Sequence, residues 1–293
     1  MITGAKEKME KLIVEGKNRV SHVLTDIQNE MKERRDLFVK PSKMSLVVNG
    51  NVSVEIPTVD IDNKLQFTPH SLSQMYNRLH VPQPFAERLM EIDEADLLEK
   101  NLNTLKSHYC TDGTLLRNVN GTIKGFLSPS YKRMDASPIF ETFVQSSLDT
   151  GYVPLDGINT DYRYQLRFII PELFQPSKDE YVLFGLAITT GDYGGQALEM
   201  EMMILRIMCT NLAIGVDLFR KIHLGSRFTS DENVLMLSDK TQQLSIDAMA
   251  SAVNDVVGHS KDYINVLHKD ITQAVDKEGD LASATLSLKR SGF

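Results

Sequence analysis

Two Asn-Gly dipeptides, each between runs of residues with alternating polarity, constrain the fold of this chain most strongly. They occupy residues 49–50 and 120–121. A two-residue loop of this composition adopts the positive φ angles of a type I′ turn and joins two antiparallel strands. The sequence therefore predicts two β-hairpins, one over residues 46–56 and one over residues 114–127.

The second hairpin predicts an unusual pairing of charges. Counting outward from its turn places Arg117 directly opposite Lys124 on the neighbouring strand. Like charges that face each other across a sheet are destabilising unless solvent or an anion relieves them. We interpret these two cations as candidate phosphate contacts, and the alternative is that both side chains extend into water.

A third strand pattern, at residues 162–170, has two chemically different faces. Aromatic and aliphatic residues alternate with Arg163, Gln165 and Arg167. Because successive side chains of a strand point to opposite faces, one face suits packing against helices and the other is basic. The sequence therefore predicts a sheet with one covered side and one available side.

Further segments complete the predicted architecture. Residues 181–190 and 197–206 form a second long hairpin pattern, and apolar residues at a spacing of three to four predict long helices over residues 5–36 and about 238–275. The fold class is therefore α+β, with a central antiparallel sheet that has helices on one face and long helices at both ends. We expect an N-terminal amphipathic helix (1–40), a central α+β domain (41–228) and a C-terminal helical region with a flexible tail (229–293).

Both terminal helices are amphipathic, and their partner is an open question at the level of the sequence. The N-terminal helix packs on its own domain or on a second copy, and a basic nucleic-acid arm is the sharper alternative. We prefer packing, and we expect a homo-oligomer formed through the terminal helices. The tail after residue 276 has little periodicity and is the best candidate for a segment that binds a phage or host protein.

The charge balance and the reactive residues restrict the class of function. The 293 residues carry 32 Lys and Arg against 39 Asp and Glu, a formal charge of −7, so any nucleic-acid site must be local. Cys110 and Cys209 form no CxxC pair, and the seven histidines have no metal-ligand spacing. We therefore expect no metal, no cofactor and no enzymatic activity. We interpret Asp135, Arg206 and Asn211, which resemble no known acid/base arrangement, as turn caps and strand-end hydrogen-bonding groups.

No segment has the composition of a signal peptide or of a membrane span. Charged residues begin at Lys6, and no window approaches the ~18 uninterrupted apolar residues of a spanning helix. The expectation is a soluble, intracellular protein without a membrane partner.

Two sequence motifs resemble those of a known protein family. Residues 127–135 have the pattern Leu-Ser-x-x-Tyr-x-x-x-Asp, and residues 206–211 have the pattern Arg-x-x-Cys-Thr-Asn. Together with segments around residues 68–82 and 185–194, they resemble the "phage/plasmid-like protein" family, which carries a domain of unknown function, over about residues 65–220. The resemblance implies a bacteriophage or mobile-element protein that works in the bacterial host cytoplasm, often among genes for DNA replication and recombination.

The residues and the resemblance together suggest a protein that binds single-stranded DNA in recombination or replication, with or without annealing it. In this hypothesis cations neutralise phosphates and aromatic rings stack on bases. The expected contacts are Arg117, Lys124, Tyr131, Lys132, Arg133, Arg163 and Arg167. The alternative is a self-assembling structural or scaffolding phage protein that does not bind DNA.

Overall fold

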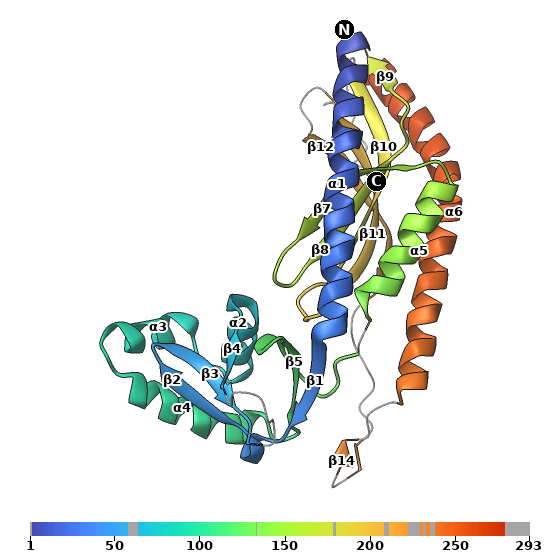
Figure 1. Ribbon diagram of the computed structural model, residues 1–293. Coiled ribbons are helices and arrows are strands. Elements are labelled where there is room, and N and C mark those ends of the chain that lie inside the picture. The colour runs from blue at the N-terminus through green and yellow to red at the C-terminus, as the bar shows by residue number, and fades with distance from the viewer. Residues whose placement is uncertain are drawn as a thin grey trace.

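The computed structural model confirms the α+β class, with six α-helices and two six-stranded sheets among the residues it describes (Figure 1). Among those residues, no helix is both long enough and apolar enough to cross a membrane. The described residues are 2–57, 64–132, 134–177, 180–207, 211–221, 229–230, 233–234 and 238–278.

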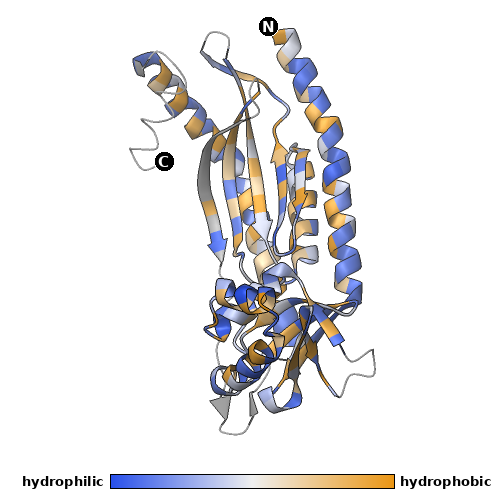
Figure 2. Ribbon diagram, turned by 90° about the vertical axis from the view of Figure 1, so that its left-hand side faces the viewer, coloured by the Kyte–Doolittle hydropathy of each residue, from blue (hydrophilic) through white to orange (hydrophobic). Residues whose placement is uncertain are grey.

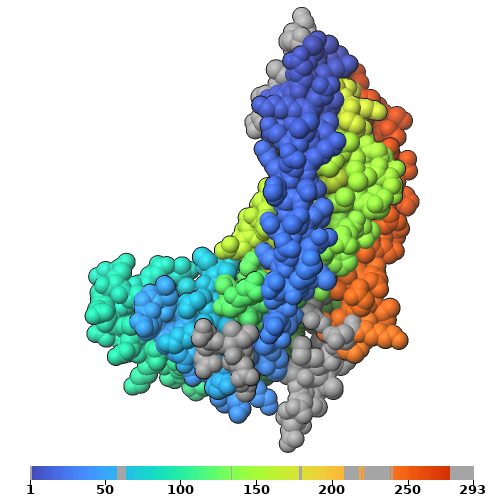
Figure 3. Space-filling view, in the orientation of Figure 1, coloured from blue at the N-terminus to red at the C-terminus, as the bar shows by residue number. Residues whose placement is uncertain are grey.

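The first sheet has the strand order β1-β5-β6-β4-β3-β2 and is mixed, because β4 and β6 run parallel while the other neighbours are antiparallel. Helices α2, α3 and α4 pack against it around their own core. This lobe projects sideways from the longer body that holds the rest of the chain (Figure 3). Its elements are β1 (Arg34–Val39), a 3-10 turn (Pro41–Lys43), β2 (Ser45–Asn49), β3 (Asn51–Glu55), β4 (Lys64–Phe67), α2 (Pro69–Arg78), α3 (Gln83–Glu91), α4 (Ala95–Tyr109), β5 (Thr114–Val119) and β6 (Thr122–Leu127).

The second sheet has the order β12-β11-β10-β8-β7, with β9 also paired to β10, and every pair is antiparallel. The described residues thus form two large sheets, where the sequence predicts one central sheet. Helices α5 and α6 cover one face of the second sheet, and α1 runs along its β7 edge (Figures 1 and 2). Its elements are α1 (Ile2–Glu33), α5 (Ala136–Asp149), β7 (Val153–Asn159), β8 (Tyr164–Ile169), β9 (Phe174–Ser177), β10 (Glu180–Thr190), β11 (Leu198–Arg206), β12 (Asn211–Lys221) and α6 (Asp239–Glu278), and a short pair β13 (Thr229–Ser230) and β14 (Asn233–Val234) precedes α6.

Both hairpins with Asn-Gly turns are present, but the register of the second differs from the prediction. Arg117 pairs with Gly125, and Asn118 pairs with Ile123, so Lys124 is an extra residue at a β-bulge. The prediction that Arg117 faces Lys124 is therefore wrong. A one-residue bulge shifts the pairing of every residue beyond it along the strand. Counting outward from the turn does not reveal such a bulge.

The two-faced pattern of the third predicted strand is confirmed in β8. Tyr164, Leu166 and Phe168 are buried in the core beneath α5 and α6. Gln165 and Arg167 lie on the opposite face, where Gln165 donates to Thr189 Oγ1 on β10 at 2.9 Å. The opposite face of β8 is therefore partly polar, and part of it is hydrogen-bonded to the neighbouring strand β10.

The first helix ends three residues earlier than predicted, because the chain changes directly from α1 to β1 between Glu33 and Arg34. Its apolar stripe packs within the protein, as expected, through Val20, Val23 and Ile27. A Cβ atom on Gly16 would lie 2.4 Å from the main-chain carbon and oxygen of Leu155, so the helix touches the β7 backbone at this point. Only glycine permits that approach.

The C-terminal helical region is one helix, α6, and its apolar stripe is also buried. Val253, Val257, Ile264 and Leu267 belong to the same core as α1 and α5. Both terminal helices thus share a core with the second sheet, although the expected domain boundaries would separate them from it.

Candidate functional site

A group of five buried or partly buried charged side chains lies where the two sheets meet, and we call it the junction cluster: Arg34, Asp36, Arg117, Asp135 and Asp192. Arg117 is its centre. The Arg117 guanidinium is fully buried and donates to Asp36 Oδ1 at 2.9 Å and to Asp135 Oδ1 at 3.2 Å. It also donates to the main-chain oxygen of Asp192. Its neighbour in the strand, Leu116, faces the α2–α4 core, so Arg117 points toward the second sheet.

Arg34 and Asp192 complete the junction cluster and connect it to α5. The Arg34 guanidinium donates to Asp192 Oδ2 at 2.7 Å and to Asp135 Oδ1 at 2.5 Å. The other oxygen of Asp192, Oδ1, accepts the N–H of Ala136 at 2.9 Å, the first residue of α5. Asp192 therefore caps a helix from a distant loop, which satisfies one of the free N–H groups at the helix start.

Two arginines and three aspartates give the junction cluster a formal charge of 2 − 3 = −1. Burial raises the pKa of Asp192, and the guanidinium groups of Arg34 and Arg117 oppose that rise. The N-terminal end of α5 adds partial positive charge beside the carboxylates. A buried charge without partners would be strongly destabilising. Each of the five side chains has an ion-pair partner within the junction cluster, so the cluster can join the two sheets without that penalty.

Beside the junction cluster, the carboxylate of Glu30 on α1 interacts with three donor groups. Its carboxylate accepts the Tyr164 hydroxyl at 2.9 Å and the Tyr193 hydroxyl at 2.6 Å, and it forms an ion pair with Lys124 at 2.7 Å. Burial acts to raise the pKa of Glu30, but the hydrogen bonds from Lys124 and Tyr193 outweigh it and hold the pKa below its ordinary value. The Lys124 ammonium also lies 5.3 Å from the centre of the Tyr193 ring.

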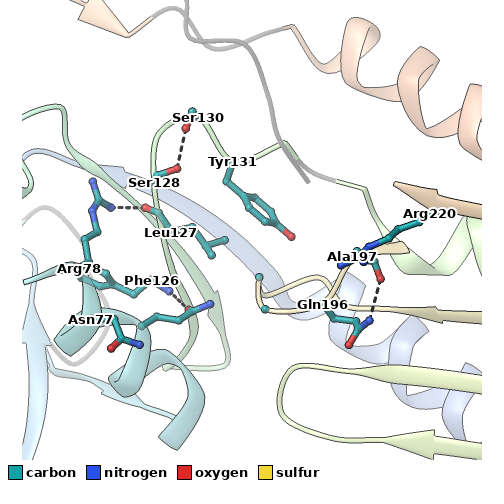
Figure 4. Close-up of a pocket in the computed structure, with 13 residues that line it drawn as sticks. Asn77, Arg78, Phe126, Leu127, Ser128, Ser130, Tyr131, Gln196, Ala197 and Arg220 are labelled. Carbon is teal, nitrogen blue, oxygen red and sulfur yellow. Dashed lines mark hydrogen bonds between the residues drawn. The ribbon is translucent and has the colours of Figure 1, made fainter. Parts of the chain in front are cut away.

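An open cleft of about 690 Å³ lies next to these groups, between the end of β6 and the turn that joins β10 to β11. We call it the junction cleft. Figure 4 shows residues of α2, β6 and the following loop on one side, and Gln196, Ala197 and Arg220 on the other, with the Tyr131 ring between them. It is lined by Gln74, Asn77, Arg78, Phe126, Leu127, Ser128, Ser130, Tyr131, Gly194, Gly195, Gln196, Ala197 and Arg220.

Part of the cleft wall is held rigidly by hydrogen bonds. Arg78 donates to the main-chain oxygens of Leu127 at 2.6 Å and Gly113 at 2.7 Å. Gln74 accepts the N–H of Phe126 and donates to the main-chain oxygen of Tyr193, so it bridges the two sheets. These contacts fix the shape of the cleft.

Other lining side chains are accessible. Asn77 and Arg220 are exposed, and Arg220 reaches Glu199 at 3.1 Å on the open surface. Outside the lining itself, His70 and Tyr162 stack at 4.9 Å between ring centres, and the His70 ring lies beside Gly195. Polar side chains and aromatic rings are therefore both within reach of a ligand here.

The predicted site residues fall into separate places. Arg117 is buried and fully engaged, so in this structure no phosphate reaches it, and Lys124 is paired with Glu30. Tyr131 lines the junction cleft, and the Arg117 guanidinium lies 6.0 Å from its ring centre. These three residues lie together at the junction, but only Tyr131 borders the cleft.

The remaining predicted residues lie elsewhere or cannot be placed. Arg163, just before β8, is half-buried, and its Nε atom has no hydrogen-bond partner among the described residues. Arg167 on β8 lies 3.8 Å from Asp156. Lys132 is half-buried, and Arg133 lies outside the described residues.

Three residues expected to be caps or strand-end groups have mixed outcomes. Asp135 precedes α5 but makes no side-chain cap, so that interpretation is wrong; its carboxylate binds Arg34 and Arg117 instead. Arg206 forms an ion pair with Glu180 at the end of β11. The side chain of Asn211 and the whole of Cys209 lie outside the described residues. In the described part of the chain, no three His, Cys, Asp or Glu residues are arranged to hold a metal ion.

Sequence reasoning missed most of the junction cluster. Arg34, Asp36 and Asp192 come from segments up to 158 positions apart, and nothing in their local sequence marks them as neighbours. The helix predicted over residues 5–36 includes the first half of β1, and Asp192 lies between the two strands predicted at residues 181–190 and 197–206. The one available signal was Asp135 in the motif at residues 127–135.

Comparison with known proteins gives no further guide: no family model, no curated protein and no solved structure matches this chain. The resemblance described above therefore rests on its sequence motifs, and function is argued from the geometry.

Proposed function

We propose that the protein binds single-stranded DNA in the junction cleft. The observation that carries this proposal is the charge of the cleft: Arg78 and Arg220 line it and no lining residue is a carboxylate, while Glu199, the ion-pair partner of Arg220, lies outside the lining, in a chain whose formal charge is −7. A local site of this kind is what an acidic protein needs in order to bind a polyanion.

The rest of the lining supports a single strand rather than a duplex. Asn77, Gln196 and the serines at 128 and 130 offer hydrogen bonds to bases and sugars, and Tyr131 offers an aromatic ring. Single strands present unpaired base edges and ring faces to such groups, whereas a duplex hides them. A role in phage recombination or replication, with or without strand annealing, belongs to the same proposal.

The test is fluorescence anisotropy of a labelled oligonucleotide, measured against protein concentration at low and near-physiological salt. We expect single strands to bind more tightly than duplex, with affinity that falls as salt rises. The double variant Asn77→Asp, Gln196→Glu places two carboxylates in the cleft and should weaken binding at least about tenfold through repulsion.

The matched control is the double variant Asn18→Asp, Gln273→Glu. It makes the same chemical changes at exposed positions on α1 and α6, so the net charge changes equally. The proposal is overturned if single strands do not bind at low salt, or if both double variants bind equally well.

The scaffolding alternative has one observation in its favour. Val14 on α1 and Val266 on α6 are exposed by 63% and 52% of their surface, on helices whose main apolar stripes are already buried. A homo-oligomer through the terminal helices would use these residues, and sedimentation analysis of Val14→Asp and Val266→Asp variants tests it. Loss of assembly with unchanged DNA binding would separate this role from the first.

A further inference from the structure

A second hollow lies at the other end of β6, where α1 passes into β1 beside the tip of the β5–β6 hairpin. We call it the hairpin pocket, and its volume is about 300 Å³. It is lined by Lys32, Glu33, Arg35, Asn118, Asn120 and Gly121. The junction cleft includes Leu127, at the far end of the same six-residue strand, so the two sites are separated by about 20 Å of extended chain.

The two cations of the hairpin pocket are not engaged by the protein. Lys32 and Arg35 are exposed, and neither forms an ion pair or a side-chain hydrogen bond within the described part of the chain. They contrast with Arg34 between them, whose guanidinium is bound by two aspartates. Strand alternation explains the difference, because Arg34 and Arg35 point to opposite sides of β1.

A buried amide provides an independent sign of a missing partner. Asn118 is 5% exposed, and its Oδ1 atom is buried without any hydrogen-bond partner among the described residues. Its Nδ2 atom also has no partner there and is the group that can donate to a phosphate oxygen, whereas Oδ1 is an acceptor and needs a donor, such as a hydroxyl group of the ligand. A buried amide without partners is rare in folded proteins and calls for an explanation.

We propose that the hairpin pocket binds a phosphate group, carried by a nucleic-acid strand or by a free nucleotide. The ammonium of Lys32 and the guanidinium of Arg35 supply the charge, and the amide nitrogens of Asn118 and Asn120 supply further donors. Phosphate oxygens accept several charge-assisted hydrogen bonds at once, and arginine matches their geometry. This site does not depend on the junction cleft being a DNA site.

Glu33 gives the proposal a distinctive consequence. It is the only carboxylate among the lining residues, and it reduces the formal charge of the pocket to +1. Replacing it with glutamine removes a repulsion from the phosphate without removing any donor. Glu33→Gln should therefore tighten phosphate binding severalfold, an effect that a merely structural role of the pocket would not produce.

The direct test is nuclear magnetic resonance of the full-length protein during titration with inorganic phosphate, a deoxynucleoside monophosphate and a short single-stranded oligonucleotide. We expect the side-chain amide signal of Asn118 and the backbone signal of Gly121 to shift. In the double variant Lys32→Gln, Arg35→Gln the affinity for the mononucleotide should fall about tenfold, because two charged donors are lost. For the oligonucleotide, we expect the slope of log affinity against log salt concentration to become shallower, by the equivalent of about two phosphate contacts.

The control is Lys17→Gln, Lys43→Gln, which removes two exposed cations elsewhere and leaves the net charge of the two double variants equal. If all three probes leave Asn118 unchanged, or if the two double variants behave alike, the proposal is overturned. A shift with the nucleotides but not the oligonucleotide assigns the site to a free nucleotide, and the reverse assigns it to a strand. The cleft variant Asn77→Asp, Gln196→Glu should leave the Asn118 shift with inorganic phosphate intact, so a failure of the proposed function is distinguishable from a failure here.

Discussion

Asp36 and Arg117 are direct partners across β1 and β5, and two hydrogen bonds of 2.9 and 3.2 Å join the carboxylate to the guanidinium. The guanidinium is completely buried, so this pair holds an edge strand of the first sheet in place at the point where the second sheet begins. A two-pronged pair of this kind fixes orientation as well as distance.

Removing one partner should therefore be costly. We expect Asp36→Asn to lower the free energy of unfolding by about 3 kcal/mol, because it leaves the buried guanidinium with too little compensating charge. Urea denaturation followed by circular dichroism measures the change. The control is Glu55→Gln, which breaks the exposed pair with Lys64 across β3 and β4 of the same sheet and should cost less than about 1 kcal/mol. Similar losses in the two variants would contradict the structural role of the buried pair.

The contacts of Glu30 predict that the stability of the fold depends on pH. The pKa of Glu30 is lower in the folded protein than its ordinary 4.5, so its ionised form stabilises the fold at higher pH. That contribution is complete above the ordinary pKa and is lost as the pH falls through the lowered folded value. In Glu30→Gln, the free energy of unfolding should be reduced at neutral pH and should decline less steeply below about pH 4.5 than in the unaltered protein. Parallel curves for the two proteins would show that Glu30 is not the group responsible.

The close contact between α1 and β7 predicts opposite effects at two glycines of one helix. Gly16→Ala should destabilise the protein by about 1–3 kcal/mol, because the new methyl group meets the Leu155 backbone at 2.4 Å. Gly4→Ala should be neutral or slightly stabilising, since nothing lies within 4 Å of its added Cβ and alanine favours helix. Thermal unfolding of the pair measures the difference, and equal melting temperatures would argue against the contact.

Deleting residues 1–36 should abolish folding rather than assembly alone. The deletion removes four core residues, Ala5, Val20, Val23 and Ile27, and half of β1 with the Asp36 carboxylate. We expect the shortened chain to lose its cooperative unfolding transition in denaturant, whatever its state of association. A shortened chain that still unfolds cooperatively would show that α1 is an appendage to an independent core.

Local patterns in the sequence predicted the elements but not how they meet. The Asn-Gly turns and the alternation of β8 depend on neighbouring residues, and both are present. The bulge at Lys124 and the burial of Arg117 depend on contacts with distant segments. Charge alone indicated a phosphate contact at Arg117, but the aspartates that neutralise it come from other parts of the chain. The same limit applies to Lys32 and Arg35, because the pocket that they line is completed by Asn118, Asn120 and Gly121 from a distant hairpin.

The passage from α1 into β1 without a loop has a mechanical consequence. A helix of 32 residues is about 48 Å long, and it continues directly into an edge strand of the other sheet. Because no loop separates them, the packing that holds α1 against the second sheet also fixes the direction in which β1 enters the first sheet. A ligand held by Lys32 and Arg35 would therefore contact both the end of α1 and the start of β1 at once.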